Sequence, residues 1–213
     1  MKIAVIDDDK SALASLARLI KSAGIEVLPF SSARAFLDDP NLSQVDCAVT
    51  DLRMPGVDGL KLQEMLAETV PYLSVVFITG HGDIPKTVKA IRGGAIDFLE
   101  KPVDDSALLE AVRRGAERSR EQRASHTEID ELQRRYGLLT ARERQVFSLV
   151  TSGLLNKQAG AELGVSERTI KVHRARVMLK MNAESLAELV RMADRLDIRP
   201  DTKADWQKTK PIG

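Results

Sequence analysis

Short runs rich in apolar residues alternate with amphipathic segments of helical period along the first half of the chain. Such runs predict strands that are buried on both faces of a sheet. They lie at residues 3–6, 25–30, 47–50, 73–78 and 97–100. Helical periodicity follows each run, at residues 11–23, 32–37, 60–70, 84–91 and from 105 onward. This alternation predicts an α/β fold with a five-stranded parallel, doubly wound sheet of the flavodoxin-like kind.

Residues 137–197 show helical periods only. Thr140 and Glu143 have the spacing of a capping box at the start of one helix, which Gly153 closes. Three further helices are predicted at residues 156–163, 167–181 and 186–196. Two helices joined by a tight turn that contains glycine are typical of a helix-turn-helix. The second region is therefore predicted to be a small all-α domain of four helices.

The predicted domains are residues 1–118 and 137–197, with a linker at 119–136 and a flexible tail at 198–213. The linker is highly charged and contains no proline, which favours a mostly helical segment, with a solvated flexible tether as the alternative. The tail is mostly polar, and Trp206 is its only aromatic residue.

Composition adds a contrast in charge between the two regions. A length of 213 residues with 43% hydrophobic content suits two small packed domains. The net charge of +1 hides an acidic front, with 11 Lys/Arg against 16 Asp/Glu in residues 1–105, and a basic back, with 10 against 7 in residues 137–197. A basic second domain favours a polyanionic partner.

A cytoplasmic protein without a membrane-spanning segment is expected. The single cysteine, Cys47, allows no intramolecular disulfide and fits a reducing compartment. The amino-terminal apolar run reaches Asp7 too soon for a signal peptide. No stretch approaches the roughly 18 apolar residues of a membrane span.

The ends of the predicted strands carry the candidate chemistry, because ligands gather at the carboxyl edge of a parallel sheet. The residues delivered there are Asp7, Asp8, Asp51, Thr79 and Lys101. Crowded carboxylates repel one another unless a hard cation such as Mg²⁺ lies between them. A lysine and a hydroxyl then suit phosphate, so the set favours phosphoryl transfer to Asp51. The alternative for Asp51 is a turn or helix-capping aspartate, and the spacing leaves open which of Asp7 to Asp9 faces inward.

Four motifs carry a family resemblance: Val5–Asp9, Thr50–Gly56, Ile78–Gly80 and Phe98–Pro102. Together they resemble the receiver domain of two-component response regulators over about residues 1–118, and Thr79–Asp83 is most similar to the FixJ-type branch. The resemblance implies a flavodoxin-like receiver in which Asp51 accepts a phosphoryl group from a sensor histidine kinase. It implies Mg²⁺ on Asp7, Asp8, Asp51 and the Arg53 backbone carbonyl, phosphoryl binding by Thr79 and Lys101, a switch formed by Thr79 and Phe98, and a cis Lys101–Pro102 bond. Plain core packing is the alternative for Phe98.

The third helix of the second region divides its residues by spacing. Ile170, His173, Val177 and Met181 are predicted to face the core, which favours a packed histidine over a pH switch. Another face carries residues suited to base edges in the major groove: Arg168, Lys171, Val172, Ala175 and Arg176. Three residues are better suited to DNA phosphates: Thr169, Lys157 and Lys180. A merely solvated basic face is the alternative.

The segments Leu139–Val146, Asn156–Lys157 and Val165–Met178 resemble the LuxR/NarL-type four-helix DNA-binding domain over about residues 137–196. The sequence departs from that pattern at two points. Ala159-Gly160 replaces the usual Ile-Ala, and a glycine inside a helix costs about 0.5–1 kcal/mol relative to alanine. Leu155 stands where a capping Ser or Thr is usual, so Asn156 is predicted to cap instead.

The two resemblances together imply a DNA-binding response regulator that regulates transcription. Activation is expected, because it is the usual action of that family. Phosphorylation is expected to favour a homodimer through the face Lys86 to Ala111, with RNA polymerase as a further partner. Half-sites would lie about 34 Å apart. The chain is expected to be no enzyme beyond self-phosphorylation from a phosphodonor and slow self-dephosphorylation. The alternatives are a Mg²⁺-dependent aspartyl-phosphate phosphohydrolase and a docking scaffold without regulated DNA binding.

Overall fold

The computed structural model describes residues 1–80 and 84–198, with side chains for all of these except residues 84–87. Two compact units are present, Met1–Ser125 and a second that begins at His126. The predicted tail, 198–213, lies outside the described residues apart from Ile198, as do His81 to Asp83 of the FixJ-like motif. Within the described ranges, no helix is both long and apolar enough to cross a membrane.

The first unit is built on the predicted five-stranded parallel sheet, with strand order β2-β1-β3-β4-β5. The strands are β1 (Lys2–Ile6), β2 (Glu26–Phe30), β3 (Cys47–Asp51), β4 (Ser74–Thr79) and β5 (Asp97–Glu100). The order changes direction between β1 and β3, and ligands bind beside such a point in open α/β sheets. The pairing of Ile6 with Thr50 places the carboxyl ends of these two strands side by side.

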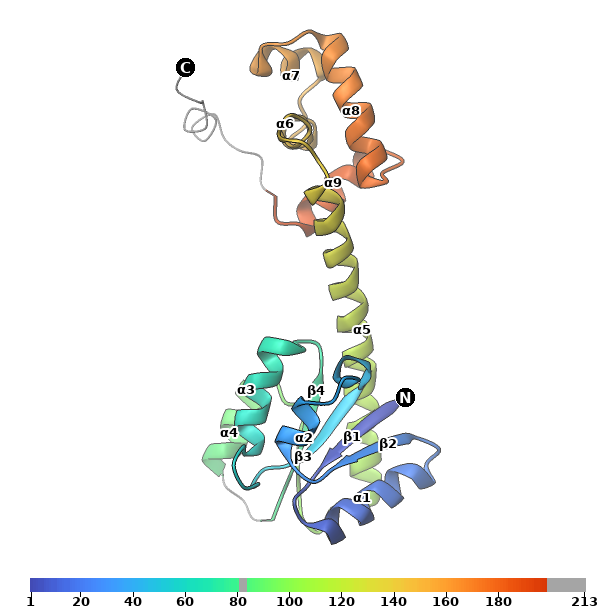
Figure 1. Cartoon of the computed structure of the whole chain (residues 1–213), viewed down its shortest axis with the longest axis vertical. Coiled ribbons are helices and arrows are strands. Elements are labelled where there is room, and N and C mark those ends of the chain that lie inside the picture. Colours follow the sequence, from blue (N-terminus) through green and yellow to red (C-terminus); the bar gives the residue numbers. More distant parts are fainter. Residues whose placement is uncertain (81–83, 199–213) are drawn as a thin grey trace. The chain divides into compact units, whose positions relative to one another are not determined.

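Helices cover both faces of this sheet, so the doubly wound prediction is confirmed (Figure 1). One face packs against α1 (Lys10–Ser22) and the first half of α5 (Asp105–Gly137). The other packs against α2 (Ala33–Leu37), α3 (Gly59–Thr69) and α4 (Ile84–Arg92), with a short 3₁₀ turn, η1 (Leu42–Gln44), before β3. Burial on both faces explains why the strands are apolar throughout.

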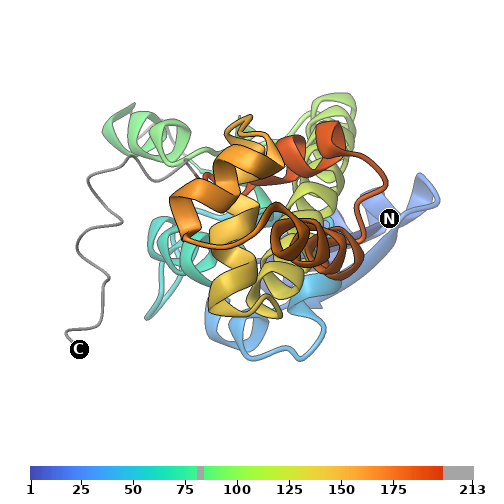
Figure 2. The ribbon, with the colours of Figure 1, turned by 90° about the horizontal axis from the view of Figure 1, so that it is seen from above.

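The second unit is the predicted four-helix arrangement. Its helices are α6 (Ala141–Thr151), α7 (Asn156–Leu163), α8 (Glu167–Met181) and α9 (Leu186–Arg195). Helix α6 packs against each of the other three. Figure 2 shows these helices, coloured from yellow to red, from above. The capping box of Thr140 and Glu143 is present, and Ser166 caps α8.

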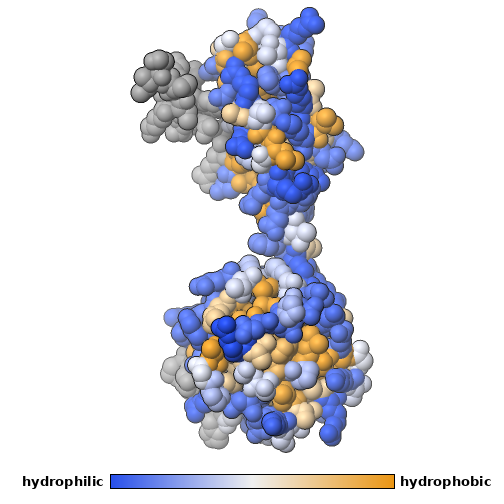
Figure 3. Space-filling model, in the orientation of Figure 1, coloured by the Kyte–Doolittle hydropathy of each residue, from blue (hydrophilic) through white to orange (hydrophobic). Residues whose placement is uncertain are grey.

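The stretch predicted as a linker lies inside a single helix, α5, which runs from Asp105 to Gly137. Arg123, near the middle of α5, donates a hydrogen bond to the carbonyl of Val45 in the first unit. Leu132, nearer its end, is 5% exposed and belongs to the core of the second unit. Hydrophilic side chains cover the middle of α5 in Figure 3. Each unit therefore includes part of the predicted linker.

The two departures in α7 have local structural reasons. A Cβ on Gly160 would lie 2.8 Å from the carbonyl oxygen of Val165, so glycine lets α7 approach the following turn. The prediction that Asn156 caps α7 is wrong. Its Oδ1 accepts a hydrogen bond from Arg174 (3.2 Å), while Gln158 Oε1 accepts from the Leu155 N–H (2.8 Å). The Gln158 side chain thus accepts from the backbone N–H of the N-cap residue, whereas Leu155 has no side-chain oxygen that could accept from the Gln158 N–H.

Candidate functional site

Asp51 ends β3 and is 9% exposed. Its Oδ2 accepts a hydrogen bond from the Arg53 backbone N–H (2.9 Å), and its Oδ1 lies 2.9 Å from Lys101 Nζ. The cap of the next helix, α3, is Asp58, whose Oδ1 accepts from the Lys61 N–H (2.8 Å). Asp51 is therefore not a helix-capping aspartate, but its bond to the N–H of Arg53, two residues on, is that of a turn aspartate, the other form of the alternative.

Asp7 is the inward-facing member of the acidic run that follows β1. It is 2% exposed, and its Oδ2 lies 2.9 Å from Lys101 Nζ. Asp8 is exposed, and Asp9 caps α1 by accepting from the Ser11 and Ala12 N–H groups (2.7 and 3.0 Å). The Ala12 and Ser11 hydrogen bonds lower the pKa of Asp9. The structure thus settles which of the three carboxylates points toward Asp51.

Lys101 joins the two buried carboxylates with one ammonium group. Burial alone would lower the pKa of Lys101, but the hydrogen bonds and charges of Asp51 and Asp7 outweigh it and raise the pKa above the ordinary lysine value. The Lys101–Pro102 peptide bond is cis, as the resemblance implies. A lysine held charged between two carboxylates supplies the counter-charge that buried anions need.

The two predicted switch residues lie at neighbouring strands. Thr79 ends β4 and is 2% exposed, and its carbonyl accepts from the Lys101 N–H (2.7 Å). Phe98 is half-buried in β5, and its ring centroid lies 6.1 Å from that of Phe77. Phe98 also packs against the core on the α2–α3–α4 face. Thr79 and Phe98 therefore lie on adjacent, paired strands.

This edge brings together the carboxylates of Asp7 and Asp51, the ammonium of Lys101 and the strand end that bears Thr79. The two carboxylates that contact the Lys101 ammonium supply hard oxygen atoms, which are the ligands that fit Mg²⁺. The arrangement can therefore support nucleophilic phosphoryl transfer to a carboxylate.

The second candidate surface lies on α8, whose inward residues Ile170, Val177 and Met181 are fully buried. The predicted base-facing side chains are all exposed: Arg168, Lys171, Val172, Ala175 and Arg176. Lys171 pairs with Glu167 one turn away (3.1 Å). His173 is half-buried, and its Nδ1 is buried with no hydrogen-bond partner among the described residues, which favours a packed histidine.

The three residues predicted for DNA phosphates have different surroundings. Lys157 is exposed on α7, and Thr169 Oγ1 lies 2.9 Å from Ser166 Oγ at the start of α8. Lys180 instead contacts Glu143 Oε2 (2.6 Å) and the Leu138 carbonyl (3.1 Å). Lys180 thus joins the end of α8 to the start of α6.

Sequence reasoning missed Asp46, a 6% exposed carboxylate just before β3. It accepts from the Lys2 N–H (2.9 Å) and from Arg120 in α5 (2.9 Å), with Arg123 3.5 Å away. Burial raises the pKa of Asp46, but the Arg120 hydrogen bond and the other donors outweigh it and lower the pKa. The signal available in the sequence was an acidic residue directly before an apolar strand, together with two arginines, Arg120 and Arg123, three positions apart in a predicted helix.

Both units of the chain match families of known proteins. Residues 3–113 match the response regulator receiver domain, and residues 137–193 match the luxR family of bacterial regulatory proteins. Nodulation protein W of Bradyrhizobium diazoefficiens is 46% identical over 194 residues, 91% of this chain and 86% of that protein. The transcriptional regulatory protein FixJ of Azorhizobium caulinodans is 46% identical over 200 residues, 94% of this chain and 95% of the relative.

Two solved structures span most of the chain. The response regulator StyR shares 44% identity and a TM-score of 0.79, over 91% of this chain and 98% of that one. Full-length FixJ from B. japonicum shares 41% identity and a TM-score of 0.54, over 92% of this chain and 97% of its own.

Proposed function

Because this chain belongs to the response regulators that join a receiver domain to a LuxR-type DNA-binding domain, we propose that phosphorylation of Asp51 governs its action on DNA. It is a two-component regulator of transcription with a helix-turn-helix. A sensor kinase and DNA are the partners that these domains imply, and both matched families are regulatory rather than enzymatic. The observation that carries the proposal is the bridge from Lys101 to Asp7 and Asp51, 2.9 Å on each side.

In the proposed reaction, a carboxylate oxygen of Asp51 attacks the phosphorus of a phosphohistidine on the kinase. A phosphorus–oxygen bond forms, and the phosphorus–nitrogen bond breaks with its electron pair returning to the histidine. Lys101 and Thr79 bind the phosphoryl oxygens. Asp7, Asp8, Asp51 and the Arg53 carbonyl would hold Mg²⁺, which would neutralise the charge of the transferring group.

The phosphoryl group adds about −1.5 to −2 charges at the edge of the sheet. Thr79 turns toward the new oxygens, and Phe98 moves into the space beside it. The face Lys86 to Ala111 is remodelled and pairs with a second copy of the chain. Exposed apolar side chains at Val88 (43%) and Ile91 (56%) on α4 support this choice of interface.

In the proposed DNA complex, α8 enters the major groove. Arg168, Lys171, Val172, Ala175 and Arg176 meet base edges there, and their exposure supports this role. Lys157 and Thr169 contact phosphates, whereas Lys180 keeps its place against Glu143. A dimer then binds two half-sites about 34 Å apart and activates transcription through RNA polymerase.

The decisive experiment is labelling with radioactive acetyl phosphate in Mg²⁺. We expect about one label per chain, lost in Asp51→Asn and kept in Asp58→Asn, because asparagine still caps α3. Release of many phosphates per chain would instead support the phosphohydrolase alternative. Unchanged promoter occupancy under phosphodonor in Asp51→Asn would support the docking scaffold.

DNA affinity of the fragment 126–213, measured beside the unphosphorylated full chain, tests whether the receiver restrains the DNA-binding unit. Tighter binding by the fragment supports restraint, and equal affinities rule it out. The fragment begins at His126 because α5 supplies Leu132 to the core of this unit.

A further inference from the structure

Gln63 is a buried polar side chain on α3 that contacts α4. It is 8% exposed, although glutamine is mostly found at the surface. Its Nε2 donates a hydrogen bond to the Ala90 carbonyl of α4 (3.1 Å). The same carbonyl accepts from the Ala95 N–H (3.1 Å) at the turn that leads into β5. Gln63 therefore holds the carboxyl-terminal end of α4 at the point where the chain turns toward β5.

The turn after α4 leaves room for this amide. A Cβ on Gly93 would lie 2.8 Å from Gln63 Oε1 and 3.1 Å from its Nε2. Gly94, with φ of +90°, adopts the left-handed conformation that favours glycine. The close fit shows that the contact involves both α3 and the turn.

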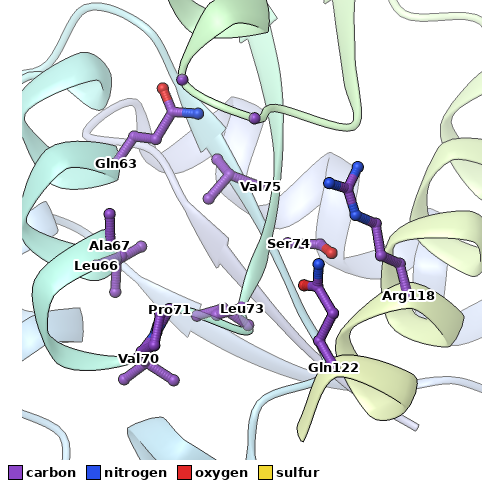
Figure 4. A pocket seen from close by; sticks show the side chains of 12 residues that line it. Gln63, Leu66, Ala67, Val70, Pro71, Leu73, Ser74, Val75, Arg118 and Gln122 are labelled. Atoms are coloured by element: carbon purple, nitrogen blue, oxygen red, sulfur yellow. The ribbon is translucent and has the colours of Figure 1, made fainter. Parts of the chain in front are cut away.

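Little else on the described surface of α4 fixes it. Among its side chains at 88–92, Ala90 is buried and the other four are exposed. Lys89 pairs with Glu64 of α3 (3.0 Å), but both side chains are largely exposed, and such pairs contribute little. Gln63 also lines a cavity of about 120 Å³ that reaches to Arg118 and Gln122 of α5 (Figure 4). An element with few buried contacts opens more readily than the core.

We propose that Gln63 is a positioning residue that latches α4 in its resting place and sets how readily the α4–β5 face is remodelled. This inference rests on the proposed function, in which phosphorylation acts through that face. The latch binds the carbonyl of the buried residue Ala90, whereas Val88 and Ile91 are exposed, so it can restrain the helix without entering the interface. Losing one hydrogen bond of about 1 kcal/mol changes a two-state balance by about fivefold.

Amide hydrogen exchange in the unphosphorylated full chain tests the latch directly. In Gln63→Leu we expect exchange at residues 93–95 to be about fivefold faster, while the Ile96 amide, bonded to Val75 in the sheet, stays unchanged. Gly93→Ala reaches the same contact from the other side and should give the same pattern. Gln122→Leu, on the opposite wall of the cavity, is the matched control and should leave residues 93–95 unaffected.

A second measurement follows self-association at limiting acetyl phosphate. The latch predicts that Gln63→Leu dimerises at about fivefold lower phosphodonor, with unchanged phosphoryl stoichiometry at saturation. Unaltered exchange at 93–95, or faster exchange spread evenly over β1 and β3, overturns the latch. Failure of the wild-type chain to associate under phosphodonor overturns the proposed function instead, and the exchange comparison still decides the role of Gln63.

Discussion

One ammonium group compensates two buried carboxylates at the carboxyl edge of the sheet. Lys101 lies 2.9 Å from both Asp7 and Asp51. A divalent cation bound there has to share these oxygens with a positive charge already in place. In the proposed function, Lys101 would therefore assist phosphoryl binding and oppose metal binding at the same time.

Replacing Lys101 with methionine separates these two effects. We expect Mg²⁺ affinity to rise by about tenfold, because repulsion between neighbouring positive charges is removed, while phosphoryl acceptance falls. Calorimetric titration with MgCl₂ measures the first, and acetyl phosphate labelling the second. Lys61→Met, at an exposed ion pair, is the control. Weaker Mg²⁺ binding in Lys101→Met would contradict this account.

A pH effect is expected at Glu143, where the Lys180 hydrogen bond, then that of the Thr140 N–H, lowers the carboxyl pKa from 4.5 to about 2. A group with a lowered folded-state pKa stabilises the fold fully above its unfolded pKa and loses that effect as the pH falls. Exchange protection of α6 should therefore weaken between pH 4.5 and about 2. Glu143→Gln should show lower protection at pH 7 and a flatter dependence in this window. An unchanged slope in the variant would exclude Glu143 as the source.

The identity of the site residues could be predicted from their place after apolar strands, but their orientation could not. Asp7 and Asp8 are neighbours in sequence, and only the turn into α1, capped by Asp9, turns one inward and leaves the other exposed. Lys180 carries the same charge as Lys157, yet its position opposite Glu143 ties it to α6. Such differences come from tertiary contacts that single-chain periodicity does not encode.

At the scale of elements, α5 approaches β3 closely on the α1–α5 face. A Cβ on Gly115 would lie 2.7 Å from Cys47 Sγ. Burial and the nearby charge of Asp46 raise the pKa of Cys47 to about 12, so its thiol stays protonated and serves as packing. A glycine inside a helix lowers its stability. Gly115 is nevertheless the residue that lets α5 lie this close to the sheet.

Gly115→Ala should destabilise the receiver by about 1–3 kcal/mol, because an added carbon overpacks the contact. Cys47→Ala removes the opposing sulfur, so the double variant should be more stable than the sum of the two single changes predicts. Urea unfolding of the four proteins measures this coupling. Strictly additive values would show that the two residues do not share the contact.

At the scale of the whole molecule, both units include part of α5. On the receiver side, Ser119 Oγ accepts from the Ser74 N–H (2.8 Å), and Arg120 reaches Asp46. On the other side, Arg135 donates to the Met181 carbonyl (3.3 Å), and Glu128 pairs with Arg195. The absence of proline from 119–136 favoured a helix over a flexible tether, but the few apolar residues of this stretch gave no sign that both units use it.

A receiver fragment ending at residue 118 should therefore be less stable than one ending at 125. The shorter fragment leaves the buried Asp46 carboxylate without its arginine partners, a loss of about 3 kcal/mol for such a group. Urea unfolding compares the two. The variant Arg120→Met in the longer fragment should reproduce part of this loss of stability, and equal midpoints for 1–118 and 1–125 would refute the assignment.

Sharing α5 also constrains how new regulators could arise by recombining old ones. A crossover at residue 118 would remove Ser119 from the first unit, and a crossover at residue 137 would remove Leu132 from the core of the second. Residues 124–127 are exposed and follow Arg123. A junction between the sequences of two parent regulators placed there should disturb the interior of either unit least. Hybrid regulators spliced there should fold more often than those joined at the domain limits that sequence patterns suggest.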